Sequence, residues 1–367
     1  MEPITHFLTG ACLSRAGFNR KTALCTLTMV LASEAPDLDI VTLTGGRIFY
    51  FAHHRGITHT FVGAPFVAAL VVGFVYLFYR LRQRVRPPPQ GCPGCPPVAS
   101  PSSSALPTTP RWGLLFLFAW IAVNIHILLD YTNSYGVRPF EPFSYKWYSW
   151  DIVFIYEPLL YFFLFAGLIF PALFGLINEE IGARRRGPRG RGGAIFALVG
   201  ILLVWGVRDY EHRRAVAALQ ARSYKDEQPL RVSAFPYSTD PFRWYGVVET
   251  DDFFARTLVN SRGPEVDPDG GMAIRYKPER SAPAEAAKKS FLGRVYLDWA
   301  QYPYAEVIPQ TGVESGYLVR LFDLRFYYPD RPLPALGGGV ELNGRLEVVA
   351  EWLGLRANAS GERGGSP

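Results

Sequence analysis

The first 207 residues alternate between long apolar runs and short polar breaks, a pattern typical of helices that cross a membrane. A membrane-spanning helix needs about 20 predominantly apolar residues. The runs that approach this length are 60–79, 112–131, 152–178 and the shorter 192–207. Before them, the stretch 7–35 is interrupted at Gly17-Phe18-Asn19 and predicts a hairpin of two shorter helices.

After residue 208 polar and apolar residues alternate over short windows such as 244–250 and 317–328, which predicts β-strands, while 284–299 has a helical pattern. The expected architecture is an α-helical integral membrane domain followed by a β-rich (α+β) C-terminal extramembrane domain. Segment 87–110 is rich in Pro and Ser and predicts a linker loop within the first domain, since it cannot support a core. The predicted boundaries are 1–207 for the membrane domain, 208–357 for the β-rich domain and 358–367 for a disordered tail.

The charge pattern adds an orientation to this architecture. Basic residues cluster at the hairpin bend (Arg15, Arg20, Lys21), after the first long run (80–86) and after the third (184–191). Positively charged loops stay in the cytoplasm, so the opposite ends of these helices should face outward across a bacterial inner or cytoplasmic membrane. The last run then places the C-terminal domain outside. Basic residues just beyond that run argue against this, and a cytoplasmic C-terminal domain remains the alternative.

The net charge of +6 is compatible with nucleic-acid binding, but the arginines lie beside apolar runs, which favours a role in membrane topology. We therefore expect the lipid bilayer as a partner and no nucleic acid. The sequence has four cysteines, and Cys92 and Cys95 form one C-P-G-C motif. That motif has no second pair and no neighbouring histidine, so it does not predict a zinc site.

The candidate chemistry lies in the membrane domain, where five of the six histidines fall within the first 130 residues. Each lies near a carboxylate or a second histidine, and the motifs concerned are A-P-D-L-D, H-H-R-G-I-T-H and N-I-H-I-L-L-D. Ionisable residues in apolar surroundings are costly and usually functional. The predicted topology brings all of them to the outward-facing ends of their helices. The candidate ligands are His6, Asp37, Asp39, His54, His59, His126 and Asp130.

Histidine and carboxylate side chains are ligands for catalytic divalent metals. His126 and Asp130 are four residues apart, so a helix presents both on one face. A catalytic zinc ion needs about three protein ligands and a water, and the surplus here leaves room for a second ion or a general base. Asp37 and Asp39 would act as bridging ligands or as the base. Arg55 would hold an anionic group of a small-molecule or lipid substrate, such as a phosphate.

Each motif also has a purely structural explanation. Asp37 and Asp39 could cap a helix, Arg55 could anchor at the membrane interface, and His126 with Asp130 could form an intramembrane hydrogen bond. A non-enzymatic metal-binding or transport protein is the alternative function. A transporter, however, would carry its ionisable residues near the middle of the membrane. Here they lie near the ends of the apolar runs, which favours an enzyme at the interface.

At these motifs the chain resembles the YdjM/YfhP-type membrane-bound metal-dependent hydrolases. That family shows an early histidine, P-D-x-D, H-R-G-x-T-H-S and S-H-x-x-x-D, which match the candidate ligands above. The resemblance implies hydrolysis by a metal-activated water and favours a phosphoester or lipid-linked substrate. It adds Asp151 and Glu157, in W-D-I-V-F-I-Y-E-P, as further candidate ligands. The chain departs from the family pattern at Thr60, at Asn124-Ile125 and at Glu157, where the family has aspartate.

Overall fold

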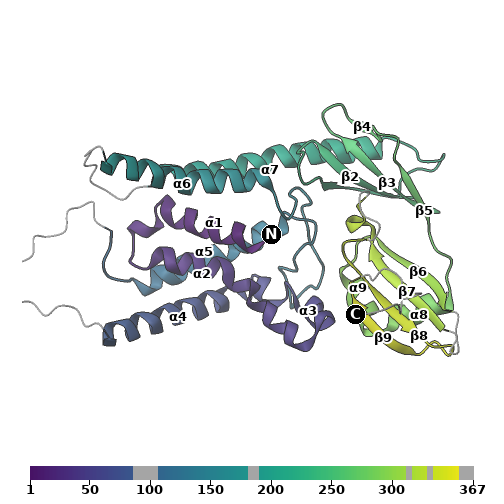
Figure 1. Cartoon of the computed structure of the whole chain (residues 1–367), viewed down its shortest axis with the longest axis horizontal. Coiled ribbons are helices and arrows are strands. Elements are labelled where there is room, and N and C mark those ends of the chain that lie inside the picture. Colours follow the sequence, from purple (N-terminus) through teal and green to yellow (C-terminus); the bar gives the residue numbers. More distant parts are fainter. Residues whose placement is uncertain (86–105, 181–189, 311–315, 329–333, 355–367) are drawn as a thin grey trace, which may run out of the picture. The chain divides into compact units, whose positions relative to one another are not determined.

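The chain forms two compact units, one helical and one rich in β-strands (Figure 1). This confirms the expected helical membrane domain with a β-rich C-terminal domain. The computed structural model describes residues 1–85, 106–180, 190–310, 316–328 and 334–354. Most of the predicted linker 87–110 and the whole predicted tail 358–367 lie outside these residues. The helical unit comprises Met1–Asp39 and Arg55–Asp209, and the second unit comprises Ile40–His54 and Tyr210–Pro367.

The helical unit begins with the predicted hairpin. Helix α1 (Pro3–Ala16) and helix α2 (Cys25–Glu34) are joined through the 3-10 turn η1 (Phe18–Arg20). The two helices pack closely because Gly10 has no side chain, and a Cβ added there would lie 2.9 Å from the carbonyl oxygen of Met29. This close approach of the two backbones holds α1 against α2.

Three helices of the described chain are long and apolar enough to cross a membrane: α4 (Ala64–Val85), α5 (Trp112–Tyr131) and α7 (Arg191–Gln220). Helix α6 (Pro158–Glu180) starts with a shorter apolar stretch, Pro158–Pro171. Large apolar side chains such as Phe66 and Leu70 are exposed along α4. Such exposure is expected where lipid, and not water, surrounds a helix.

Two details of these helices differ from the apolar pattern. The third run was expected from residue 152, but α6 starts at Pro158, a residue favoured in the first helical turn. The fourth run was expected to be short, but α7 is 30 residues long. The helix continues into a polar stretch after Val207, so hydropathy alone marks only its first half.

The basic turns gather at one end of the helical unit. Arg191, at the start of α7, donates a hydrogen bond from Nε to the carbonyl oxygen of Ala16 at 3.0 Å. The backbone N–H of Ala23 donates to the carbonyl of Thr109, just before α5, at 3.3 Å. Figure 1 shows the arginine-bearing end of α4 at the same end of this unit. From the positive-inside rule we expect this end to face the cytoplasm.

This orientation can be tested with the native cysteines Cys92 and Cys95, which belong to the segment after α4. We expect a membrane-impermeant maleimide to leave them unlabelled in spheroplasts and to label them after permeabilisation, because the preceding arginines hold this segment inside. Background should be low because Cys12 and Cys25 are buried. A variant with both Cys92 and Cys95 replaced by Ser is the matched control. Labelling of intact spheroplasts at these positions would reverse the orientation.

The second unit contains two antiparallel sheets. The five-stranded sheet has the order β1-β2-β3-β4, with β5 also paired to β3, and the four-stranded sheet has the order β6-β7-β8-β9. The first sheet consists of β1 (Arg231–Pro236), β2 (Arg243–Glu249), β3 (Phe253–Asn260), β4 (Glu265–Val266) and β5 (Ala273–Tyr276). The second consists of β6 (Pro303–Gln310), β7 (Gly316–Asp323), β8 (Gly337–Leu342) and β9 (Val348–Leu353).

The helix expected over 284–299 is divided in two, α8 (Ala282–Lys289) and α9 (Phe291–Trp299). Ser290 has an extended backbone, and its hydroxyl accepts a hydrogen bond from the backbone of Gly293 at 3.0 Å, so it begins a new helix. Helix α3 (Arg47–His53) also belongs to this unit. Its Phe51 ring lies 5.2 Å from the ring of Trp299 in α9.

Candidate metal centre

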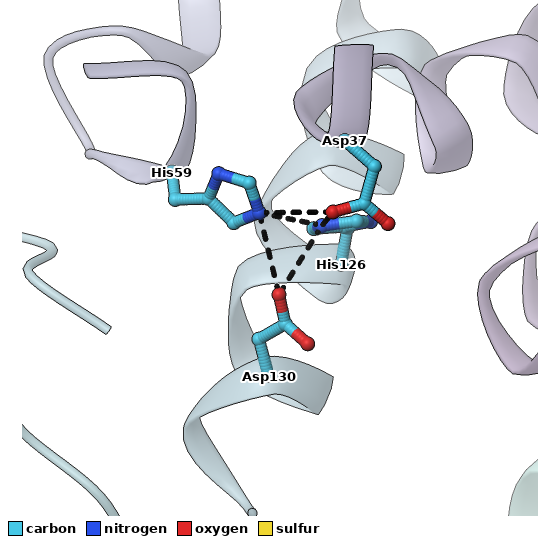
Figure 2. Close-up of side chains that lie close together, drawn as sticks. All are labelled: Asp37, His59, His126 and Asp130. Atoms are coloured by element: carbon cyan, nitrogen blue, oxygen red, sulfur yellow. Dashed lines mark hydrogen bonds and ion pairs between the residues drawn. The ribbon is translucent and has the colours of Figure 1, made fainter. Parts of the chain in front are cut away.

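Four predicted ligands meet inside the helical unit (Figure 2). One ligand atom from each of them lies within 4.8 Å of all the others. They come from three elements: the 3-10 helix η2 (Ala35–Gly45), the 3-10 turn η3 (Ile57–His59) and α5. Three of the four are buried, and the fourth, Asp37, is partly exposed. The group is Asp37, His59, His126 and Asp130.

Helix α5 supplies half of the group from one face. His126 Nε2 lies 3.4 Å from Asp130 Oδ2, as expected for residues four apart on a helix. The other ring nitrogen, Nδ1, lies 2.6 Å from the carbonyl oxygen of Ser33. A proton on Nδ1 satisfies this carbonyl and leaves the lone pair of Nε2 directed at the group. Metal-binding histidines are commonly oriented by such a bond.

Four further distances between the ligand atoms are similarly short. His59 Nε2 lies 3.0 Å from His126 Nε2, 3.4 Å from Asp37 Oδ1 and 3.3 Å from Asp130 Oδ2. His126 Nε2 lies 3.6 Å from Asp37 Oδ1. Ligands bound tetrahedrally to zinc at 2.0–2.2 Å are roughly 3.3–3.6 Å apart. Five of the six distances between the ligand atoms are therefore near those expected around one divalent ion, and the sixth, between the carboxylate oxygens of Asp37 and Asp130, is within 4.8 Å.

An unsatisfied carboxylate oxygen supports the same interpretation. Asp130 Oδ2 is buried and accepts no hydrogen bond from the described residues, although it faces both imidazoles. A buried acceptor without a partner is costly, and a cation would satisfy it. Asp130 Oδ1, in contrast, is well occupied. It accepts a bond from Arg55 Nη2 at 2.7 Å and another from the amino group of Met1.

The two ligands outside the membrane-spanning helices have shifted pKa values. Burial works to raise the pKa of Asp37, but contact with His59 and the charge of His126 hold it below its ordinary range. Burial works to lower the pKa of His59, but the carboxylates of Asp130 and Asp37 raise it above its ordinary value. Asp37 is therefore ready to ligate as a carboxylate, whereas His59 must release a proton before it binds a metal.

Arg55 and Asp39 support the group from outside it. Arg55 has a left-handed backbone, with φ of 56°, which is unfavourable for a residue with a side chain. Its backbone N–H donates to Asp39 Oδ2 at 2.8 Å, and its Nη1 donates to the carbonyl of Gly136 at 2.9 Å. Asn133 accepts a further bond from Nη1 at 3.3 Å. These contacts keep the guanidinium on Asp130.

His6 lies directly beside the four residues. Its ring stacks on that of His126 with the centroids 3.7 Å apart, and its Nε2 lies 3.4 Å from Asp130 Oδ1. Both of its ring nitrogens are buried without a hydrogen-bond partner among the described residues. His6 is therefore available as a ligand for a second ion, or for a bound molecule, beside the site formed by the four residues.

The other predicted ligands have different surroundings and are not among the four. His54 directly follows α3 as its C-cap, and its ring lies 4.8 Å from that of Tyr50. Asp151 accepts a hydrogen bond from Ser149 at 3.1 Å. Glu157 forms a buried ion pair with Arg208 at 2.8 Å. Their roles as ligands stay predictions.

Asn133 and the carbonyl of Ser33 also contribute to the site, and neither was predicted from the sequence. Asn133 lies just beyond the end of α5, so helical spacing does not predict its place, and its nearness to Asp130 in the sequence is the signal that could have pointed to it. The part played by Ser33 has no signal in the sequence, because any residue could supply its carbonyl.

Comparison with known proteins gives two matches. A family model described as YdjM inner membrane protein matches residues 1–215, more than half of the chain. The uncharacterized protein YfhP of Bacillus subtilis (strain 168) is 26% identical over 131 residues, which cover 35% of this chain and 31% of that protein. The match thus spans about a third of that relative. No solved structure matches the chain.

Proposed function

This chain belongs to the YdjM inner membrane protein family, and we propose that it is a membrane-bound metal-dependent hydrolase. It is an integral protein of the inner membrane with a buried group of histidines and aspartates that could hold a metal ion. The observation that carries the proposal is the close grouping of Asp37, His59, His126 and Asp130, with one ligand atom of each within 4.8 Å of all the others. Two imidazoles and two carboxylates suit zinc.

The residues have separate roles in this proposal. A divalent ion bound here would lower the pKa of a coordinated water and so supply a nucleophile at neutral pH. Asp37 is the partly exposed member of the group and lies where an incoming substrate would meet the site. Arg55 makes several contacts around Asp130, so we assign it as a positioning residue in place of the anion-binding role expected from the sequence. Asp39 orients Arg55 through its backbone.

A phosphoester or lipid-linked phosphoester is the proposed substrate class. The site lies at the end of α5, a helix apolar enough to cross a membrane, and a substrate anchored in the bilayer would reach it from there. Phosphoester cleavage also suits metal catalysis, because a metal stabilises the charge that develops on the transferred oxygens. The second candidate function is a non-enzymatic metal carrier. The deep burial of His59, His126 and Asp130 favours this alternative.

We expect metal-dependent turnover from the full chain in lipid nanodiscs. The assay measures phosphate or alcohol release from a phosphomonoester, a phosphodiester and a lipid pyrophosphate, after chelation and after return of Zn²⁺. At least one class should be cleaved, with turnover lost on chelation and restored by zinc. His53→Gln is the matched control, because His53 is an exposed histidine whose Nδ1 bonds to the Phe49 carbonyl. Full zinc loading without cleavage of any class would favour the metal carrier.

A further inference from the structure

A second feature of the molecule, confined to the β-rich unit, is an arginine on an apolar face of the five-stranded sheet. Arg256 in β3 lies opposite Val247 in β2, and its neighbours on the same face are Phe254 and Leu258. Val247 and Phe254 belong to a cluster of buried apolar residues with Phe322. A charged side chain at such a position is costly unless an opposite charge accompanies it.

A second arginine shares this face. Arg275 in β5 lies opposite Phe254, so it is a diagonal neighbour of Arg256 across the strand pair. Both guanidinium groups lie over the ring of Tyr327, with Cζ at 4.1 Å and 4.8 Å from its centroid. Arg256 Nη1 donates to the carbonyl of Tyr327 at 2.5 Å, and Arg275 Nη2 donates to its hydroxyl at 3.0 Å.

The pair carries positive charge without compensation. Among the described residues, no carboxylate forms an ion pair with either arginine. The Nε–H of Arg256 is buried and has no hydrogen-bond acceptor among the residues that the structure describes. Burial and the neighbouring charge of Arg275 lower the pKa of Arg256 to about 10. The site thus has an unused donor and an unpaired charge, and an anion would satisfy both.

Arg256 lines a cavity of about 400 Å³, within the size range of small-molecule sites. The rings of Tyr245 and Tyr327 line it as well. Arg325 also reaches the cavity, but its charge is balanced by Asp323 at 2.9 Å. Asp267 and Asp269 contribute to the lining and offer acceptors for hydroxyl or ammonium groups. The lining therefore combines an anion site, aromatic surface and carboxylate oxygens.

We propose that this cavity binds an organic phosphate. Its phosphoryl group would meet the guanidinium of Arg256, whose planar donors match phosphate oxygens and whose charge the phosphate would neutralise. Hydroxyl or ammonium groups of the same molecule would face Asp267. The ligand can come from two sources with the same chemistry, a soluble phosphate ester or the headgroup of an anionic lipid. The proposal does not depend on the metal centre, because every residue in it belongs to the β-rich unit.

The test uses the full chain in neutral phosphatidylcholine nanodiscs after chelation, so that the metal centre cannot bind the probe. Glycerol 3-phosphate is titrated by calorimetry, with glycerol as the uncharged control. A second arm measures the melting temperature in nanodiscs with and without phosphatidic acid. Saturable binding of glycerol 3-phosphate indicates a soluble ligand, and stabilisation by phosphatidic acid alone indicates a lipid headgroup. Arg256→Gln should weaken the affinity for glycerol 3-phosphate at least about tenfold. In the lipid arm it should remove most of the rise in melting temperature that phosphatidic acid causes.

Two further variants separate binding from folding. Arg262→Gln is the matched control, because Arg262 stacks on Phe242, is exposed and does not line the cavity. It should bind both probes as the unmodified protein does. Arg256→Lys keeps a positive charge but removes the planar donors. This variant should fold normally and should bind the phosphate more weakly than the unmodified protein does. The proposal is overturned if neither probe acts on the unmodified protein, or if Arg256→Gln and Arg256→Lys respond as strongly as it does.

Discussion

Asp130→Asn is expected to reduce the zinc content of the purified protein from about one equivalent to background and to abolish any metal-dependent turnover. The substitution keeps the size of the side chain but removes its negative charge. Asp130 Oδ2 lies 3.3 Å from His59 Nε2 and 3.4 Å from His126 Nε2, so it contributes to the group on two edges. The remaining carboxylate, Asp37, would face two imidazoles with the positive charge of Arg55 nearby. We expect metal affinity to fall at least about a hundredfold.

Elemental analysis of protein purified in nanodiscs, with zinc added and excess removed, measures this effect. His53→Gln should keep full zinc content, because His53 is exposed and is not among the four grouped residues. Asp39→Asn tests the supporting role of Asp39. It should retain zinc more weakly than the unmodified protein, because the N–H of Arg55 loses its charged acceptor and keeps at most a neutral amide oxygen, while all four ligands remain. Full zinc content in Asp130→Asn would rule out the metal centre described here.

The sequence predicted those parts of the candidate site that depend on the spacing of residues within one helix. The four-residue spacing of His126 and Asp130 determines that both lie on one face of α5. The sequence could not tell which of Asp37 and Asp39 faces the metal group. Residues two apart on a 3-10 helix point in different directions, and tertiary packing decides which of them points inward. In the structure Asp37 faces the group, while Asp39 accepts the backbone bond from Arg55. That bond depends on the left-handed backbone of Arg55, which tertiary contacts hold in place.

The fold was predictable to a similar degree. Apolar runs located the long helices, and alternation located the strands of the second unit. The placement of α3 with α9 was not readable, because it rests on contacts such as Phe51 with Trp299 between segments about 240 residues apart. The break between α8 and α9 had a local signal, since serine is a favoured N-cap residue. The apolar surroundings of Arg256 were not readable, because they depend on residues of the second sheet such as Phe322.

Glu157→Gln is expected to destabilise the helical unit by about 3–5 kcal/mol. Glu157 lies just before α6 and accepts a hydrogen bond from Arg208 Nη2 of α7 at 2.8 Å, and both side chains are almost wholly buried. Replacement of the carboxylate leaves the guanidinium of Arg208 in an apolar region without its charge partner. Unfolding of the protein in mixed micelles, followed by circular dichroism against denaturant, measures the change.

The same variant separates two roles for Glu157. If Glu157 acts through Arg208, as its contacts indicate, Glu157→Gln should lower stability and leave zinc content unchanged. If Glu157 is a ligand, as the family resemblance implied, zinc content should fall instead. The double variant Glu157→Leu/Arg208→Met provides the control, because apolar side chains in place of both partners remove the unpaired charge. It should recover most of the lost stability, since replacing a whole buried ion pair by apolar groups is often close to neutral. A double variant as unstable as Glu157→Gln would mean that the ion pair is not the cause of the loss.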